Sequence, residues 1–205
     1  MISEVFSTLA KQYPKAVTEL NYINNYTLLV AVVLSAQATD VSVNIATKPL
    51  FAKISTPAQM LNLGETELIT YIKSIGLFRN KAKNVIKLSK MLINKFNSEV
   101  PDNHRDLISL PGVGTKTAKV VLNVAFGQPT IAVDTHVGRL STRLGLTTSK
   151  NPDVISNELE KIIPLAWRHD AHHHLILHGR YICTARKPKC DQCVISQWCQ
   201  SKGEF

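Results

Sequence analysis

The sequence predicts an all-α protein of about ten helices, and three observations lead to that class. Apolar residues recur with a helical period along most of the chain, as between Arg79 and Phe96, where lysines occupy the opposite face. Prolines and glycines fall mostly between the periodic segments. Few segments alternate polar and apolar residues as a half-buried strand does.

Capping signals predict where several helices begin and end. Thr56-Pro57 and Asn151-Pro152 each combine a capping side chain with a first-turn proline, so we expect a helix to start at each. Gly64 and Gly76 lie where short helices should stop, because glycine readily adopts the left-handed conformation that ends a helix.

Length and composition limit the class of protein. The chain has 205 residues, of which 44% are hydrophobic, so it can bury a core and is not disordered. Its longest apolar run, Leu28 to Leu34, is far too short to span a bilayer. The residues from Met1 to Glu4 do not resemble a signal peptide. We therefore expect a cytoplasmic protein, associated with the nucleoid only if it binds DNA.

The charge balance indicates a polyanionic partner. Lysine and arginine total 24 against 15 aspartates and glutamates, a net charge of +9. The excess is concentrated in three acid-poor stretches, 68–98, 107–152 and 171–190. Such a distribution favours a surface that faces phosphates over a merely soluble basic protein.

The segment from Leu110 to Ala118 (Leu-Pro-Gly-Val-Gly-Thr-Lys-Thr-Ala) is the most informative motif. We expect a short helix before it and a second helix from near Thr115 to Phe126. Two glycines two apart allow a tight turn whose exposed amides can hold a phosphate beside the positive end of the next helix. Pro-Gly also occurs in ordinary turns, but the length of the motif favours a DNA-binding helix-hairpin-helix. Its contacting residues would be Gly112, Val113 and Gly114.

Lys116 lies in the first turn of the second hairpin helix. Most lysines are solvated surface charges. The alternative is a nucleophilic amine, which must lose its proton to attack and gives a Schiff base with a carbonyl-type carbon. The positive helix terminus and the neighbouring Lys119 both oppose protonation, which makes Lys116 a candidate nucleophile.

Asp134 is the one acid in the stretch from 107 to 152. It follows a short apolar run, and we expect a helix to begin there and continue through Leu144. The carboxylate could simply cap that helix. It could also take a proton from an amine nucleophile or stabilise positive charge that develops on a sugar, and the spacing leaves both roles open.

All four cysteines lie near the end of the chain, in the spacing Cys-x6-Cys-x2-Cys-x5-Cys. In a protein of a reducing compartment such a cluster indicates a metal site rather than disulfides. Four thiolates suit structural zinc or a [4Fe–4S] cluster, and the single Cys-x2-Cys pair tilts the choice towards iron–sulfur. The ligands would be Cys183, Cys190, Cys193 and Cys199.

The loop between the first two cysteines carries three cations, Arg186, Lys187 and Lys189. Clamped by a metal site, the loop would present them to phosphates. The alternative is a solvated basic loop.

Six motifs, taken in order, closely resemble the endonuclease III family, helix-hairpin-helix DNA glycosylases with AP-lyase activity. The resemblance covers nearly the whole chain. The motifs are Leu34–Asp40, Ser74–Leu77, Leu110–Ala118, Val133–His136, Leu175–Arg180 and the four cysteines.

This resemblance implies two helical lobes with a DNA cleft between them. Residues 18–129 would form a six-helix barrel that contains the helix-hairpin-helix at about 105–126. Residues 1–17 and 130–205 would form a helical domain with a C-terminal [4Fe–4S] cluster at 183–199. The resemblance favours iron–sulfur over zinc more strongly than the spacing does, and we expect a monomer that binds double-stranded DNA.

The resemblance also implies a base-excision repair reaction. An oxidised or ring-saturated pyrimidine is flipped out of the duplex. Lys116 matches the nucleophile that attacks C1′, and Asp134 matches the aspartate that assists it. A Schiff base then allows β-elimination, which nicks the strand. Gln37 and Leu77 match residues that fill the gap left by the flipped nucleotide, although they could equally be a polar helix end and a core leucine.

Three other readings remain open at this point. An adenine glycosylase of the same superfamily would lack a lysine at position 116 and carry an extra C-terminal domain. A DNA-binding scaffold without catalysis would not need both Lys116 and Asp134. A zinc-bound structural protein would contain no iron.

Overall fold

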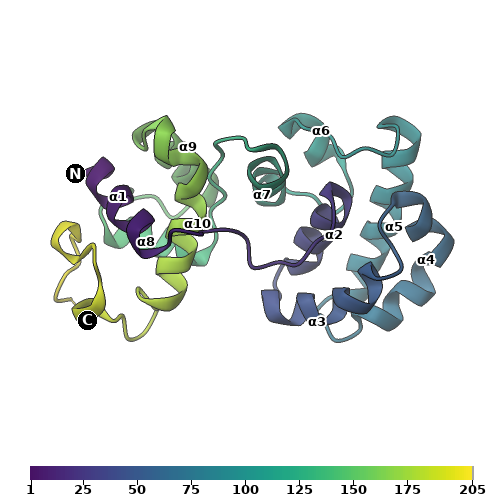
Figure 1. Cartoon of the computed structure of the whole chain (residues 1–205), viewed down its shortest axis with the longest axis horizontal. Coiled ribbons are helices and arrows are strands. Elements are labelled where there is room, and N and C mark those ends of the chain that lie inside the picture. Colours follow the sequence, from purple (N-terminus) through teal and green to yellow (C-terminus); the bar gives the residue numbers. More distant parts are fainter. Residues whose placement is uncertain (205) are drawn as a thin grey trace. The chain divides into compact units, whose positions relative to one another are not determined.

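The computed structural model describes residues 1–204 and is built from helices, as Figure 1 shows. Ten α-helices and two short 3₁₀ helices occur in this range, and no strand does. The all-α prediction is confirmed. None of these helices has the length and apolar character needed to cross a membrane.

The chain divides into two compact units. Glu19–Phe126 forms one unit, and Met1–Thr18 forms the other together with the residues from Gly127 on. The predicted division, 18–129 against 1–17 and 130–205, places each boundary a few residues away from these positions.

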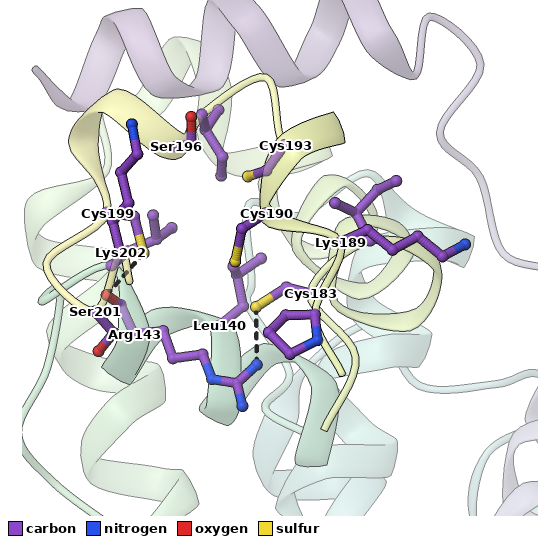
Figure 2. A pocket seen from close by; sticks show the side chains of 14 residues that line it. Leu140, Arg143, Cys183, Lys189, Cys190, Cys193, Ser196, Cys199, Ser201 and Lys202 are labelled. Atoms are coloured by element: carbon purple, nitrogen blue, oxygen red, sulfur yellow. Dashed lines mark hydrogen bonds between the residues drawn. The ribbon is translucent and has the colours of Figure 1, made fainter. Parts of the chain in front are cut away.

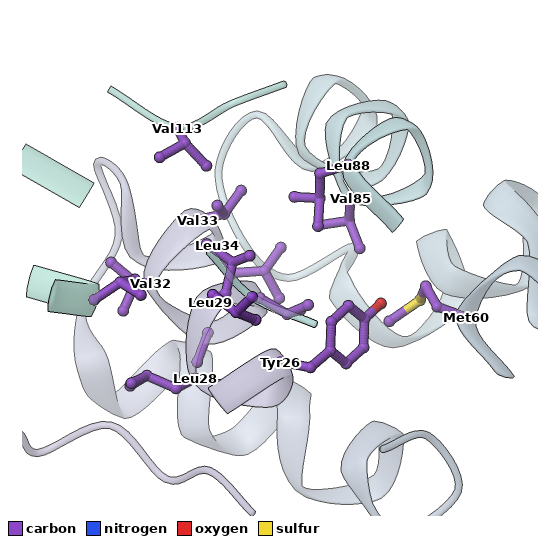
Figure 3. Packing of buried hydrophobic residues seen from close by; sticks show 14 of the residues in the cluster. Tyr26, Leu28, Leu29, Val32, Val33, Leu34, Met60, Val85, Leu88 and Val113 are labelled. Atoms are coloured by element: carbon purple, nitrogen blue, oxygen red, sulfur yellow. The ribbon is translucent and has the colours of Figure 1, made fainter. Parts of the chain in front are cut away.

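The 19–126 unit is organised around one buried helix, α2. All residues of α2 from Tyr26 to Leu34 are buried, because this helix is apolar on every side. Helices α3, α5 and α7 pack against it, and Figure 3 shows Val85 and Leu88 of α5 and Met60 of α4 in the same core. The six helices are α2 (Asn25–Ser35), α3 (Asp40–Phe51), α4 (Pro57–Ile72), α5 (Phe78–Lys95), α6 (His104–Ser109) and α7 (Thr115–Phe126).

Local sequence accounts for the helix ends in this unit and beyond. The Thr56 side chain caps α4 by accepting from the backbone N–H of Gln59, and Pro57 occupies the first turn. Asn151 caps α9 (Pro152–Ile162) in a similar way, with Pro152 in its first turn. Gly64 has φ 78°, so the helical geometry of α4 is interrupted there. These predicted boundaries are confirmed.

The second unit joins the N-terminal helix to the C-terminal part of the chain. Its helices are α1 (Ile2–Gln12), α8 (Thr135–Arg143), α9, α10 (Leu165–Tyr181) and the 3₁₀ helices η1 (Cys190–Gln192) and η2 (Ser196–Trp198). Phe6 and Leu9 of α1 are fully buried in a core shared with α8, α9 and α10. Helices α8 and α10 approach closely at Gly179, where a Cβ would lie 2.8 Å from the His136 carbonyl oxygen, so only glycine fits there.

Helix α10 carries four buried histidines, His172, His173, His174 and His178. Burial, with a smaller contribution from the nearby His169, lowers the pKa of His173 to about 4. Burial also lowers the pKa of His174. His173 and His174 are therefore neutral at pH 7 and pack as part of the interior.

The protein should lose stability as the pH falls from 6.5 towards 4. Between these pH values His173 is protonated in the unfolded chain but stays neutral in the folded protein, so acid favours the unfolded state. The loss from His173 alone should reach about 3 kcal/mol near pH 4. Urea unfolding at a series of pH values measures it, and His173→Gln should flatten the dependence. The exposed His169 provides the comparison, since His169→Gln should change the slope far less. Equal slopes for wild type and His173→Gln would contradict the assignment.

Candidate functional site

The predicted helix-hairpin-helix is present over α6, residues 110–114 and α7. Leu110 and Val113 are buried and anchor the turn in the core, and the Val113 N–H donates to the Leu110 carbonyl at 3.1 Å. Gly112 and Gly114 are exposed. The turn therefore holds its apolar side chains inward and leaves its glycine backbone at the surface.

Gly112 is required by two independent constraints. Its φ is +83°, a conformation that side-chain-bearing residues rarely adopt. A Cβ there would also lie 3.0 Å from the Cβ and from Nδ2 of Asn84 on α5. Gly114 differs, because its φ is not in the left-handed region and a Cβ would meet no atom within 4 Å.

Gly112→Ala should therefore destabilise the protein by at least about 1 kcal/mol. Gly114→Ala, two residues away, should cost less, because residue 114 is not left-handed and an added Cβ there would meet no atom within 4 Å. Thermal and urea unfolding of the two variants tests this difference. Equal stabilities would show that the hairpin does not hold residue 112 in this geometry.

Lys116 is exposed in the first turn of α7, directly after the hairpin. Within residues 1–204 no carboxylate forms an ion pair with its amine. A DNA strand held by the amides of the hairpin would thus lie beside this exposed amine.

Asp134 caps α8. Its Oδ1 accepts from the backbone N–H groups of His136 and Val137, both at 2.8 Å. The capping interpretation is confirmed. Both bonds use the same oxygen, and the side chain is only partly buried, so Oδ2 is available for a second role. The cap fixes the direction of the carboxylate.

Gln37 and Leu77 lie on adjacent loops of the 19–126 unit. A Cβ on Gly76 would lie 3.8 Å from the Gln37 carbonyl oxygen, which places the two loops side by side. Both residues have positive φ, 55° and 59°, and both are exposed. Leu77 is 58% exposed, so the alternative of a core leucine is wrong. A left-handed apolar residue held out into solvent is unusual and points to a contact outside the chain.

The four cysteines surround one pocket, as Figure 2 shows. The empty space at the pocket, including its opening to solvent, is about 410 Å³. Apolar side chains such as Leu140 and Ile195 line it together with the four cysteines. Within residues 1–204 no three His, Cys, Asp or Glu side chains lie close enough to hold a single metal ion, these cysteines included. Four thiols around an apolar pocket are the donor set of an iron–sulfur cluster.

Two side chains lie within hydrogen-bonding distance of these sulfurs. Arg143 on α8 contacts Cys183 Sγ through Nη1 at 3.3 Å (Figure 2), and His178 Nε2 lies 3.3 Å from Cys193 Sγ. Donors of this kind offset the negative charge of coordinated thiolates, so the surroundings fit a bound cluster. Burial raises the pKa of the Cys193 thiol, so a metal would have to displace its proton.

Hydrogen bonds hold the backbone of the basic loop between Cys183 and Cys190 at both of its ends. Arg143 donates to the carbonyls of Thr184 and Ala185 at 2.8 and 2.9 Å, and the Lys189 N–H donates to the Ile182 carbonyl at 2.9 Å. The three predicted cations of the loop, Arg186, Lys187 and Lys189, are all exposed. The loop thus presents its charges on a fixed backbone.

The role of Arg143 in organising the cysteine loop was not predicted from the sequence. Nor were the position of Asn84 beneath the hairpin and the contact of His178 with a cysteine. Arg143 is the last residue of α8 and lies between two buried leucines, Leu140 of the helix and Leu144 at its C-cap. A cation flanked by apolar residues was the available signal. The other two contacts are too distant in sequence to leave a local pattern.

Comparisons with known proteins agree with the geometry. Residues 30–165 match the HhH-GPD superfamily of base excision DNA repair proteins, and residues 183–199 match the iron–sulfur binding domain of endonuclease III. The second match begins and ends on a cysteine and contains all four, so the prediction of a [4Fe–4S] cofactor is confirmed.

Relatives match over almost the whole chain. Endonuclease III of Rickettsia conorii is 56% identical over 97% of this chain and 95% of its own length. That of Escherichia coli is 50% identical over 97% and 94%. A solved structure of a trapped endonuclease III–DNA covalent intermediate is 47% identical, with a TM-score of 0.92, over 99% of this chain and 96% of that one. The chain therefore belongs to the endonuclease III family of HhH-GPD base excision DNA repair enzymes, as its motifs predicted.

Proposed function

We propose that this chain removes oxidised or ring-saturated pyrimidines from double-stranded DNA and then nicks the strand at the resulting abasic site. One observation carries the proposal: two residues after a glycine hairpin with exposed backbone lies the exposed side chain of Lys116, which forms no ion pair with a carboxylate of residues 1–204. Backbone amides at a helix N-terminus bind phosphate without reading sequence, as an enzyme that must search DNA requires.

Lys116 is the nucleophile in this scheme. Its amine attacks C1′ of the flipped nucleotide, the bond from C1′ to the base breaks, and the base leaves with a proton. The sugar ring opens to a Schiff base between Nζ and C1′. Loss of a C2′ proton then expels the 3′ phosphate by β-elimination, and water releases the lysine.

Asp134 assists the excision step. The carboxylate stabilises positive charge that develops on the sugar as the base departs, and it accepts the proton that the attacking amine loses. Its N-cap bonds hold the carboxylate in one orientation, so no reorganisation is needed during the reaction.

The other predicted residues bind and shape the DNA. The amides of Gly112, Val113 and Gly114 hold one phosphate, and Arg186, Lys187 and Lys189 contact others. Gln37 and Leu77 enter the space left by the flipped nucleotide, which suits two exposed side chains on adjacent loops.

Cys183, Cys190, Cys193 and Cys199 are the ligands of the [4Fe–4S] cluster. When bound, the cluster closes the loop that carries the three cations, which is a structural contribution to DNA binding. The active species is a monomer on double-stranded DNA.

Release of a base from defined duplexes tests the proposal. Duplexes that carry thymine glycol or 5-hydroxycytosine should lose the base and be nicked, while 8-oxoguanine and undamaged duplexes should remain intact. Release of the base without a nick would contradict the bifunctional assignment. Tight binding with neither reaction on any lesion would point to a scaffold.

A further inference from the structure

His178 is fully buried on α10, and both of its ring nitrogens have partners. Nε2 lies 3.3 Å from Cys193 Sγ. Nδ1 lies 3.4 Å from the hydroxyl of Tyr13 and 3.2 Å from Oε1 of Gln12, at the C-terminal end of α1. The histidine therefore connects the N-terminal helix to a cluster cysteine.

The chemistry of the bound cysteine favours one position for the proton on this ring. A thiolate bound to iron has no hydrogen and can only accept, so a hydrogen bond between His178 and Cys193 requires the N–H on Nε2. In the neutral ring Nδ1 is then an acceptor, and the Tyr13 hydroxyl is a donor within reach. The Gln12 amide must turn its NH₂ group towards Nδ1, an orientation that heavy-atom positions alone do not distinguish.

We propose that Tyr13 and His178 together set an N–H···S hydrogen bond on Cys193 that raises the reduction potential of the cluster. Such a bond stabilises the more negative, reduced cluster over the oxidised one. His178 acts on the sulfur directly. Tyr13 is a positioning residue that selects the tautomer, because without its hydroxyl the proton can move to Nδ1 and donate to Gln12 instead.

This inference rests on the cluster being held by the four cysteines, so iron content per chain is measured first. Protein without iron would refute the assignment of the four cysteines as cluster ligands, which is a separate result from a failure of the proposed hydrogen bond between His178 and Cys193. Voltammetry of the loaded protein then gives the potential for wild type, His178→Leu, His178→Gln and Tyr13→Phe. The control is Tyr22→Phe, at a half-exposed tyrosine of the other unit.

His178→Leu and Tyr13→Phe should both shift the potential in the negative direction, and the double variant should shift it no further than His178→Leu does. His178→Gln, whose amide can donate from near the Nε2 position, should recover part of the shift. Tyr22→Phe should leave it unchanged. Among the described residues Tyr13 forms no hydrogen bond with the Cys193 sulfur, so a role in packing alone would leave the potential of Tyr13→Phe near the wild-type value.

A wild-type potential in both His178→Leu and Tyr13→Phe, each with full iron content, would overturn the proposal. If His178→Leu fails to retain the cluster, Tyr13→Phe decides the question alone. A negative shift in that variant supports the hydrogen bond, and an unchanged potential rejects it.

Discussion

Lys116→Ala should abolish both base release and strand nicking, with a loss of at least about 10³-fold. The amine forms the bond to C1′ that starts the reaction, and alanine has no group that can form it. Affinity for undamaged duplex should fall only modestly, because the variant removes one cation among many.

Lys119→Ala is the matched control, since it removes the same charge from the same helix one turn further on. This variant should retain borohydride trapping, and its rates should stay within a few-fold of wild type. Lys116→Ala with nicking activity near wild type would refute the assignment of the nucleophile.

Asp134→Asn should slow base excision by about 10²-fold or more while the protein stays folded. Asparagine caps a helix as well as aspartate does, so the bonds to His136 and Val137 can be retained and unfolding free energy should change by less than about 0.5 kcal/mol. Loss of activity without loss of stability would separate the chemical role from the capping role.

In Asp134→Asn the rate of nicking at a preformed abasic site should fall less than the rate of base excision does. An abasic sugar already offers an aldehyde, so no base has to depart and less positive charge develops. Asp153→Asn, an exposed carboxylate in the first turn of α9, is the control and should leave both rates unchanged. Full excision activity in Asp134→Asn would assign Asp134 to capping alone.

The elements that carry the proposed chemistry were predictable because their signals are local. A glycine hairpin, a capping aspartate and four clustered cysteines each depend on residues close together in sequence, and the structure places all of them as helix ends or loops.

Contacts between distant segments could not be predicted in this way. The exposure of Leu77 depends on how its loop meets the loop of Gln37, and a leucine in an apolar context is as easily core as surface. The bonds of His178 reach back across most of the chain to Tyr13. No periodicity or spacing encodes such pairs.

Peptide mapping of the borohydride-trapped adduct tests the central claim most directly. Wild-type protein is reacted with a duplex that carries an oxidised pyrimidine, reduced, digested and analysed by mass spectrometry. We predict that the sugar remnant is attached to Lys116 alone. Attachment to Lys119 or to the amino group of Met1, or release of the base with no adduct at all, would contradict the mechanism proposed for this chain.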